Sequence, residues 1–211
     1  MEFWIRYIRS LVYALSTLLG AAVYISIVVA IPATDQESAK LIQAYAFLAI
    51  AYLYIALLAS PLYSAFPNFP WRPIYIKARR AIGVSAFFFG LLHGGLAFFI
   101  SLGGFRGLGF LNAEGLTAVT LGAVALLILS LLAFTSFDYF VKKLGTRWKQ
   151  LHRLVYLAGL LIIIHALIFG THFSDLSDFI PQVSFFLLLV LLALEAVRLN
   201  KIYRTKFAKS Q

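Results

Sequence analysis

The stretch AIGVSAFFFGLLHGGLAFFISLGGF, residues Ala81–Phe105, contains no charged side chain and follows directly after the cations Arg79 and Arg80. An uncharged apolar run of about 20 residues is long enough to cross a bilayer as a helix. The run also lacks the alternation of apolar and polar residues that a strand of a membrane barrel requires. The stretch therefore predicts a membrane-spanning helix.

Five further stretches have the same character, and together the six predict an all-α integral membrane bundle. The expected helices lie at about 11–31, 41–62, 81–102, 115–137, 152–172 and 180–198. We expect the second to end near Pro61, because proline disrupts a helix interior. The first is too long for the apolar core of a signal peptide and is expected to be retained. No repeat or long linker divides the chain, so we expect one domain over residues 1–211.

The composition excludes several classes of protein. Hydrophobic residues make up 62% of the 211 residues and charged residues 12%, whereas soluble domains contain about half and a quarter. This excludes a water-soluble enzyme and a disordered chain. Without cysteine, the chain forms no disulfide, iron–sulfur cluster, thiolate zinc site or covalently attached c-type haem. It also has no dinucleotide-binding domain, so we do not expect it to take hydride from NAD(P)H by itself.

The net charge of +10 is explained by membrane topology. All 18 Lys and Arg residues except Lys40 and Arg106 fall on one side of the expected bundle. The acidic residues of the other side are Asp35, Glu37, Glu114, Asp175 and Asp178. Cytoplasmic loops carry the excess of Lys and Arg, so we expect both termini to be cytoplasmic, and no nucleic-acid partner is needed to explain the charge.

Two of the four histidines, His93 and His165, fall at matching depths on the third and fifth expected helices. Both helices start at the basic side, and a rise of about 1.5 Å per residue places both imidazoles roughly 18–20 Å from that boundary. Histidines at one level on two helices are the arrangement needed for both axial ligands of a b-type haem. We therefore predict that His93 and His165 bind the iron of one haem.

Small residues share the helical face of His93: Gly83, Ala86, Gly90, Gly94 and Ala97. A groove of this kind accommodates a flat group, and it also allows two helices to pack closely. We favour the haem interpretation, because packing alone does not require a buried imidazole.

The other two histidines leave alternatives open. His152 is expected at the basic boundary, either as the ligand of a second haem or as a hydrogen-bond partner of a propionate, a lipid or a quinone. His172 lies further out, as a propionate partner, a contact for an electron acceptor, or an ordinary loop residue. Arg79 and Arg80 are interpreted mainly as topology signals, and arginine at this position can also pair with a haem propionate or the phosphate of a flavin such as FMN.

Two segments resemble the ferric-reductase-like transmembrane family. They are ARRAIGVSAFFFGLLHGGLAFF (Ala78–Phe99) and LAFTSFDYFVKKLGTRWKQLHRLVYLAGLLIIIHA (Leu132–Ala166). Within that family the chain looks most like the haem-binding membrane subunit of the bacterial periplasmic protein-methionine-sulfoxide reductase system. The segment HALIFGTHFSD (His165–Asp175) differs, and is similar to relatives that have other partners.

The resemblance implies an electron-transfer subunit in a bacterial inner membrane, with His93, His152 and His165 as haem ligands or ligand candidates. A cytoplasmic flavin/NAD(P)H reductase or quinol would supply the electrons, and a soluble periplasmic catalytic subunit would receive them. Two alternatives stay open: a transmembrane reductase that acts directly on ferric iron or another external metal, and a haem-free scaffold or transporter.

Overall fold

The computed structural model describes residues 2–31, 35–169 and 179–207. Over these ranges the chain forms helices and no strand. The long helices are α1 (Glu2–Ala30), α2 (Asp35–Ala65), α3 (Arg72–Leu96), α5 (Ala113–Phe134), α8 (Leu154–Phe169) and α9 (Phe179–Phe207). The described ranges contain 6 helical spans long and apolar enough to cross a membrane, so the predicted six-helix membrane fold is confirmed.

Several helices extend beyond the uncharged runs that predicted them. α1 begins at Glu2 and includes Arg6 and Arg9, and α9 continues past Arg198 to Phe207. Long cationic side chains can reach the polar interface while their aliphatic stems stay on apolar surface, so a charged residue does not end a helix. The predicted ends were therefore too short at these positions.

Shorter elements connect the long helices. They are the π-helix η1 (Ala97–Ser101) and the α-helices α4 (Phe105–Leu108), α6 (Asp138–Leu144) and α7 (Thr146–Leu151). Between η1 and α4 the chain turns at Gly103 and Gly104, whose φ angles are 70° and 74°. Residues that have a side chain rarely adopt positive φ angles, so the two glycines make the turn possible.

The fifth expected helix, 152–172, begins two residues later in the structure, and its expected end at 170–172 lies outside the described residues. α7 ends at Leu151, His152 is its C-cap, and α8 begins at Leu154. At the junction Arg153 N donates to Gln150 O (3.1 Å), a bond one residue shorter than that of an α-helix. His152 and His165 therefore do not lie on one uninterrupted helix, and the predicted start of this helix differs from the observed one.

Pro61 lies inside α2 and does not end it, in contrast to our expectation. Proline removes one backbone donor and clashes with the preceding turn. In the structure, α3 supplies donors to this region: the Tyr75 hydroxyl donates to Ile55 O, and Arg79 Nε donates to Ala56 O at 2.8 Å. These bonds support the turn that precedes the proline, and the helix continues to Ala65.

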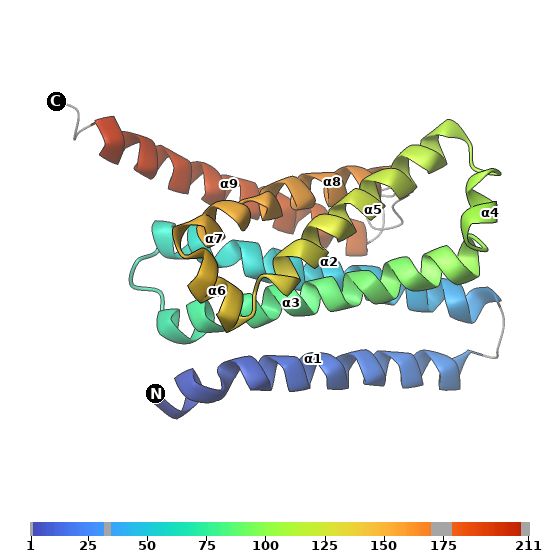
Figure 1. Ribbon diagram of the computed structural model, residues 1–211, viewed down its shortest axis with the longest axis horizontal. Coiled ribbons are helices and arrows are strands. Elements are labelled where there is room, and N and C mark those ends of the chain that lie inside the picture. Colours follow the sequence, from blue (N-terminus) through green and yellow to red (C-terminus); the bar gives the residue numbers. More distant parts are fainter. Residues whose placement is uncertain (1, 32–34, 170–178, 208–211) are drawn as a thin grey trace.

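α3 is the central helix of the bundle and packs against α1, α2 and α5 (Figure 1). α5 in turn packs against α8, and α2 against α9. The main core unites five helices, and its buried residues are Leu53, Leu57, Ala86, Leu129, Ala158 and Leu191. Large apolar side chains such as Leu18 (66% exposed) and Leu127 (70%) cover the outer surface, as lipid contact requires.

The two ends of the bundle differ in what they contain. α1 begins and α9 ends at the same end, which also holds α6 and α7, while α4 lies at the opposite end (Figure 1). The first end carries the basic side chains of α6 and α7, among them Lys142, Lys143 and Lys149. We call it the basic end.

Candidate functional site

The imidazoles of His93 and His165 lie side by side in the interior of the bundle. Their ring centres are 6.2 Å apart and their planes are inclined by 76°. His93 is on α3 and His165 on α8, and both side chains are partly buried. The structure thus brings together the two residues that we placed at matching depths.

Each of these rings is oriented by a backbone carbonyl of a neighbouring helix. His93 Nδ1 lies 3.0 Å from Ile42 O on α2, and His165 Nδ1 lies 2.8 Å from Ala118 O on α5. A carbonyl oxygen only accepts, so each Nδ1 carries the proton and each basic lone pair is on Nε2. Metal-binding histidines usually show this arrangement, in which the second ring nitrogen donates to a carbonyl or carboxylate.

Gly122 on α5 gives His165 the space it occupies. A Cβ built at Gly122 would lie 2.9 Å from His165 Nδ1 and 3.0 Å from Cε1. Those atoms belong to a rigid ring that also bonds Ala118 O, so the ring cannot turn aside without losing that bond. Our sequence analysis did not identify Gly122 as a site residue, because its only signal in the sequence is a glycine within an apolar helix.

The separation of the two rings fits a single metal ion between them. An imidazole nitrogen binds a metal at about 2.0–2.1 Å and its ring centre lies roughly 1.1 Å behind it, so opposed rings on one ion have centres about 6.2–6.4 Å apart. The observed 6.2 Å agrees with this span. The described residues contain no group of three or more His, Asp or Glu side chains that could hold a metal ion, so a metal here would need most of its ligands from a bound group, as haem iron has.

The stripe of small residues on α3 takes part in helix packing, one of the two roles we considered, and its role in accommodating a haem stays a prediction. A Cβ at Gly94 would lie 3.2 Å from Leu126 Cδ2, and one at Gly90 would lie 3.6 Å from Leu126 Cδ1. Leu126 of α5 therefore packs into this part of the stripe. Nothing lies within 4 Å of a Cβ at Gly83, so the stripe is open at this end.

His152 lies at the basic end, in the turn between α7 and α8. Its ring stacks on Trp148 with 3.9 Å between ring centres, and its Nε2 lies 3.3 Å from Thr135 Oγ1. Trp148 Nε1 donates to Thr135 O at 2.9 Å. These contacts join the end of α5 to the junction of α7 and α8, so the surroundings of His152 are those of an interfacial structural residue.

Arg79 and Arg80 both have partners within the protein. Besides Ala56 O, Arg79 bonds Ser60 Oγ through Nη1 at 2.7 Å. Arg80 Nη2 lies 2.6 Å from Asp138 Oδ1, and its Nη1 donates to Ser136 O at 3.0 Å. Their pairing with a propionate or a flavin phosphate stays a prediction.

Asp138 joins three elements at the basic end, a role that our sequence analysis did not predict. Its carboxylate, at the start of α6, pairs with Arg80 of α3 and with Arg9 of α1, the latter at 3.2 Å. The hydrogen bond from Arg80, together with the charge of that residue, lowers the pKa of the Asp138 carboxyl, and Arg9 adds to the effect. The carboxylate is therefore held ionised well below neutral pH.

His172, the remaining predicted site residue, lies outside the described residues.

Comparison with known families identifies a family whose profile matches a large part of the chain. The profile of the family described as "Ferric reductase like transmembrane component" matches residues 43–169. The match covers more than half of the chain and runs from α2 to the end of α8. It includes His93, His152 and His165, as well as Ala118, whose carbonyl accepts from His165 Nδ1, and Gly122 one turn further along α5.

Proposed function

The chain belongs to the ferric reductase-like transmembrane family, and from this premise we propose that it is a b-type cytochrome which holds one haem between His93 and His165. The observation that carries the proposal is the pair of imidazoles 6.2 Å apart, each with its Nδ1 bonded to a backbone carbonyl. The family points to a membrane electron-transfer component, and the distance between the two rings supports haem as its cofactor.

The residues of the site are suited to transferring electrons rather than to activating oxygen. When bound, haem b supplies one-electron chemistry. His93 and His165 would both bind the haem iron, and a haem held by two protein side chains would supply electron transfer rather than oxygen binding. The bonds from Nδ1 to Ile42 O and Ala118 O fix the orientation of the two rings and would raise the basicity of both ligands.

The distribution of charge supports a direction for electron flow. The basic end carries α6 and α7, and cytoplasmic segments of membrane proteins are rich in Lys and Arg. We place this end in the cytoplasm of a bacterium with the bundle in its inner membrane. The donor is then a cytoplasmic flavin/NAD(P)H reductase or membrane quinol, with FMN as a further cofactor candidate at the basic end. His152 and Arg80 lie where such a donor would approach.

For the acceptor, we propose a soluble periplasmic catalytic subunit, and more specifically a methionine sulfoxide reductase. The support is the likeness of Ala78–Phe99 and Leu132–Ala166 to the membrane subunit of such a system. A second candidate, favoured by the description of the matching family, is direct reduction of ferric iron. The two are distinguished by reoxidation of the reduced protein with ferric chelates and no partner present, which only the second predicts.

Removal of each proposed ligand tests the haem site. We expect His93→Ala and His165→Ala each to lose the haem while membrane insertion and yield stay unchanged. Matched controls are Leu91→Ala and Leu167→Ala, which change lipid-facing residues (49% and 56% exposed) two positions from each histidine on the same helices. Wild-type haem content in both histidine variants would overturn the assignment.

A further inference from the structure

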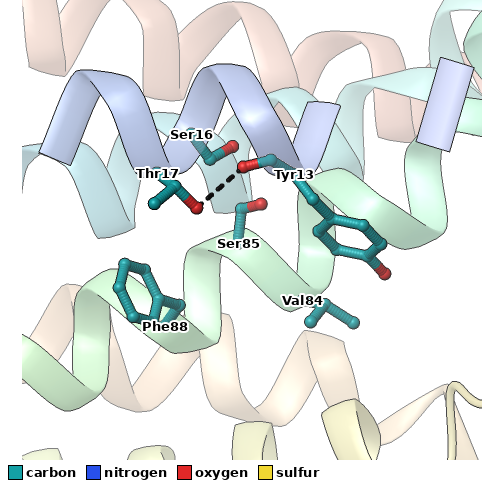
Figure 2. A pocket seen from close by; sticks show the side chains of 6 residues that line it. All are labelled: Tyr13, Ser16, Thr17, Val84, Ser85 and Phe88. Atoms are coloured by element: carbon teal, nitrogen blue, oxygen red, sulfur yellow. Dashed lines mark hydrogen bonds between the residues drawn. The ribbon is translucent and has the colours of Figure 1, made fainter. Parts of the chain in front are cut away.

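A cavity lies between α1 and α3, and Figure 2 shows the side chains that line it. Its volume is about 180 Å³, and it is lined by Tyr13, Ser16, Thr17, Val84, Ser85 and Phe88. The residues of α1 are outside the part of the chain that matches the family profile. The cavity is therefore a feature of this chain that the family match does not account for.

Ser85 is buried against the cavity without a hydrogen-bond partner. It is only 3% exposed, and within the described part of the chain its hydroxyl makes no hydrogen bond. The neighbouring hydroxyls on α1 behave differently, because Ser16 donates to Val12 O at 2.7 Å and Thr17 donates to Tyr13 O at 2.9 Å. A hydroxyl in an apolar interior is costly unless it is bonded. Ser85 thus presents a donor that its own helix does not use.

The side chains that line the cavity determine which kind of ligand could accept a hydrogen bond from the Ser85 hydroxyl. Figure 2 shows the Ser85 hydroxyl between the two helices, with the Phe88 ring on one side and the Tyr13 ring on the other. Both rings are partly exposed, at 40% and 41%, so they form a margin that opens toward lipid. No carboxylate or cation lines the cavity. The complementary ligand is an uncharged flat ring that carries a carbonyl or hydroxyl oxygen and arrives through the membrane.

The position of the cavity relates it to the histidine pair. Ser85 and His93 are on the same helix, α3, and the rise of an α-helix separates them by about 12 Å along its axis. Phe89, which is fully buried, lies between them and contacts the rings of Phe88 and Tyr52. A buried aromatic side chain thus lies on α3 between the two sites.

We propose that this cavity binds the head group of a membrane quinone, with the Ser85 hydroxyl donating to one of its oxygens and the rings of Tyr13 and Phe88 on either side. This inference names the membrane-soluble partner of the proposed cytochrome and rests on the proposed function for the choice of a redox-active ring. The binding itself depends only on residues of α1 and α3, so it can be measured separately from haem.

The test is quinone binding to the full chain in lipid nanodiscs freed of endogenous quinone. The first probe is a short-chain benzoquinone, titrated calorimetrically, and the second is its azido derivative for photo-crosslinking and peptide mapping. We expect saturable binding with crosslinks in α1 and α3. Ser85→Ala should weaken binding roughly 3- to 10-fold, the range set by one hydrogen bond. Ser85→Leu fills the cavity and should abolish binding.

The matched control is Ser26→Ala, which removes an α1 hydroxyl that bonds Val23 O and lies away from the cavity. It should bind quinone as the wild type does. Absence of binding to the wild type, crosslinks confined to other helices, or wild-type affinity in both Ser85 variants would overturn the inference. Haem content, measured on the same samples, separates the two proposals: quinone binding without haem overturns the proposed function, and haem without quinone binding overturns this one.

Discussion

The substitution Gly122→Ala tests the link between the packing of α5 and the proposed ligand His165. The new methyl carbon would lie 2.9 Å from His165 Nδ1, whereas ordinary contact begins at 3.4 Å. Restoring ordinary contact requires the imidazole to move by about 0.5 Å, which is the tolerance within which a ligand has to be held for binding. Movement away from α5 also stretches the 2.8 Å bond to Ala118 O.

The magnitude follows from the loss of that orientation. Disturbing the partner that orients a metal-binding histidine typically lowers metal affinity by 10- to 100-fold, and we expect a loss of about 10-fold or more in haem affinity. Helix propensity acts in the opposite direction, because alanine in a helix interior is favoured over glycine by roughly 0.5–1 kcal/mol. A loss of haem in this variant would thus have to come from the site rather than from a weaker helix.

The assay is haem per chain after purification, together with the rate of haem transfer to an apoprotein acceptor. The matched control is Gly83→Ala on α3, where a Cβ meets nothing within 4 Å, and its haem content should equal that of the wild type. If Gly122→Ala retains haem as firmly as Gly83→Ala does, the contact between Gly122 and His165 does not position a ligand and the reasoning is refuted.

Three further predictions concern the basic end. Arg80 lowers the pKa of the Asp138 carboxyl, so their ion pair stabilises the fold at neutral pH, and this stabilisation is lost as the pH falls from the ordinary aspartate pKa through the lowered one. The difference in melting temperature between wild type and Asp138→Asn should therefore shrink below about pH 4, and a pH-independent difference would contradict the ion pair. Arg79→Leu leaves Ala56 O without its side-chain donor and should lower the free energy of unfolding by about 1–3 kcal/mol, more than Arg79→Lys does. Equal melting curves of both variants and the wild type would show that the bond from Arg79 Nε to Ala56 O contributes nothing. His152→Ala should retain the full haem content, and a fall to half would assign His152 to a second haem.

The spans and the histidine pair were predictable from the sequence because both depend on short-range properties. Lipid imposes one requirement on each span, a long uncharged run, and the run containing His93 meets it without reference to the rest of the fold. The depth of His93 and of His165 follows from the rise of a helix and the position of the preceding cations. Equal depth on two helices was enough to predict the pair that the structure brings together.

The surroundings of the pair were not predictable, because they depend on which helix faces which. Nothing in the sequence relates Gly122 to His165, or Ile42 O to His93, until α5 packs on α8 and α2 on α3. The position of Asp138 depends in the same way on α1, α3 and α6 meeting at one end. The contacts of His152 with Trp148 and Thr135 at the turn before α8 are likewise not recorded by an apolar pattern.

The most direct measurement for the central claim is a reduced-minus-oxidised visible spectrum of the purified protein, with pyridine-haemochrome quantification per chain. The account predicts a b-type α band at about one haem per chain, the number that a single pair of axial histidines can hold. A protein that inserts and folds in the presence of adequate haem but shows no α band would contradict it. His93 and His165 would then be a buried pair that joins α3 to α8 without a cofactor.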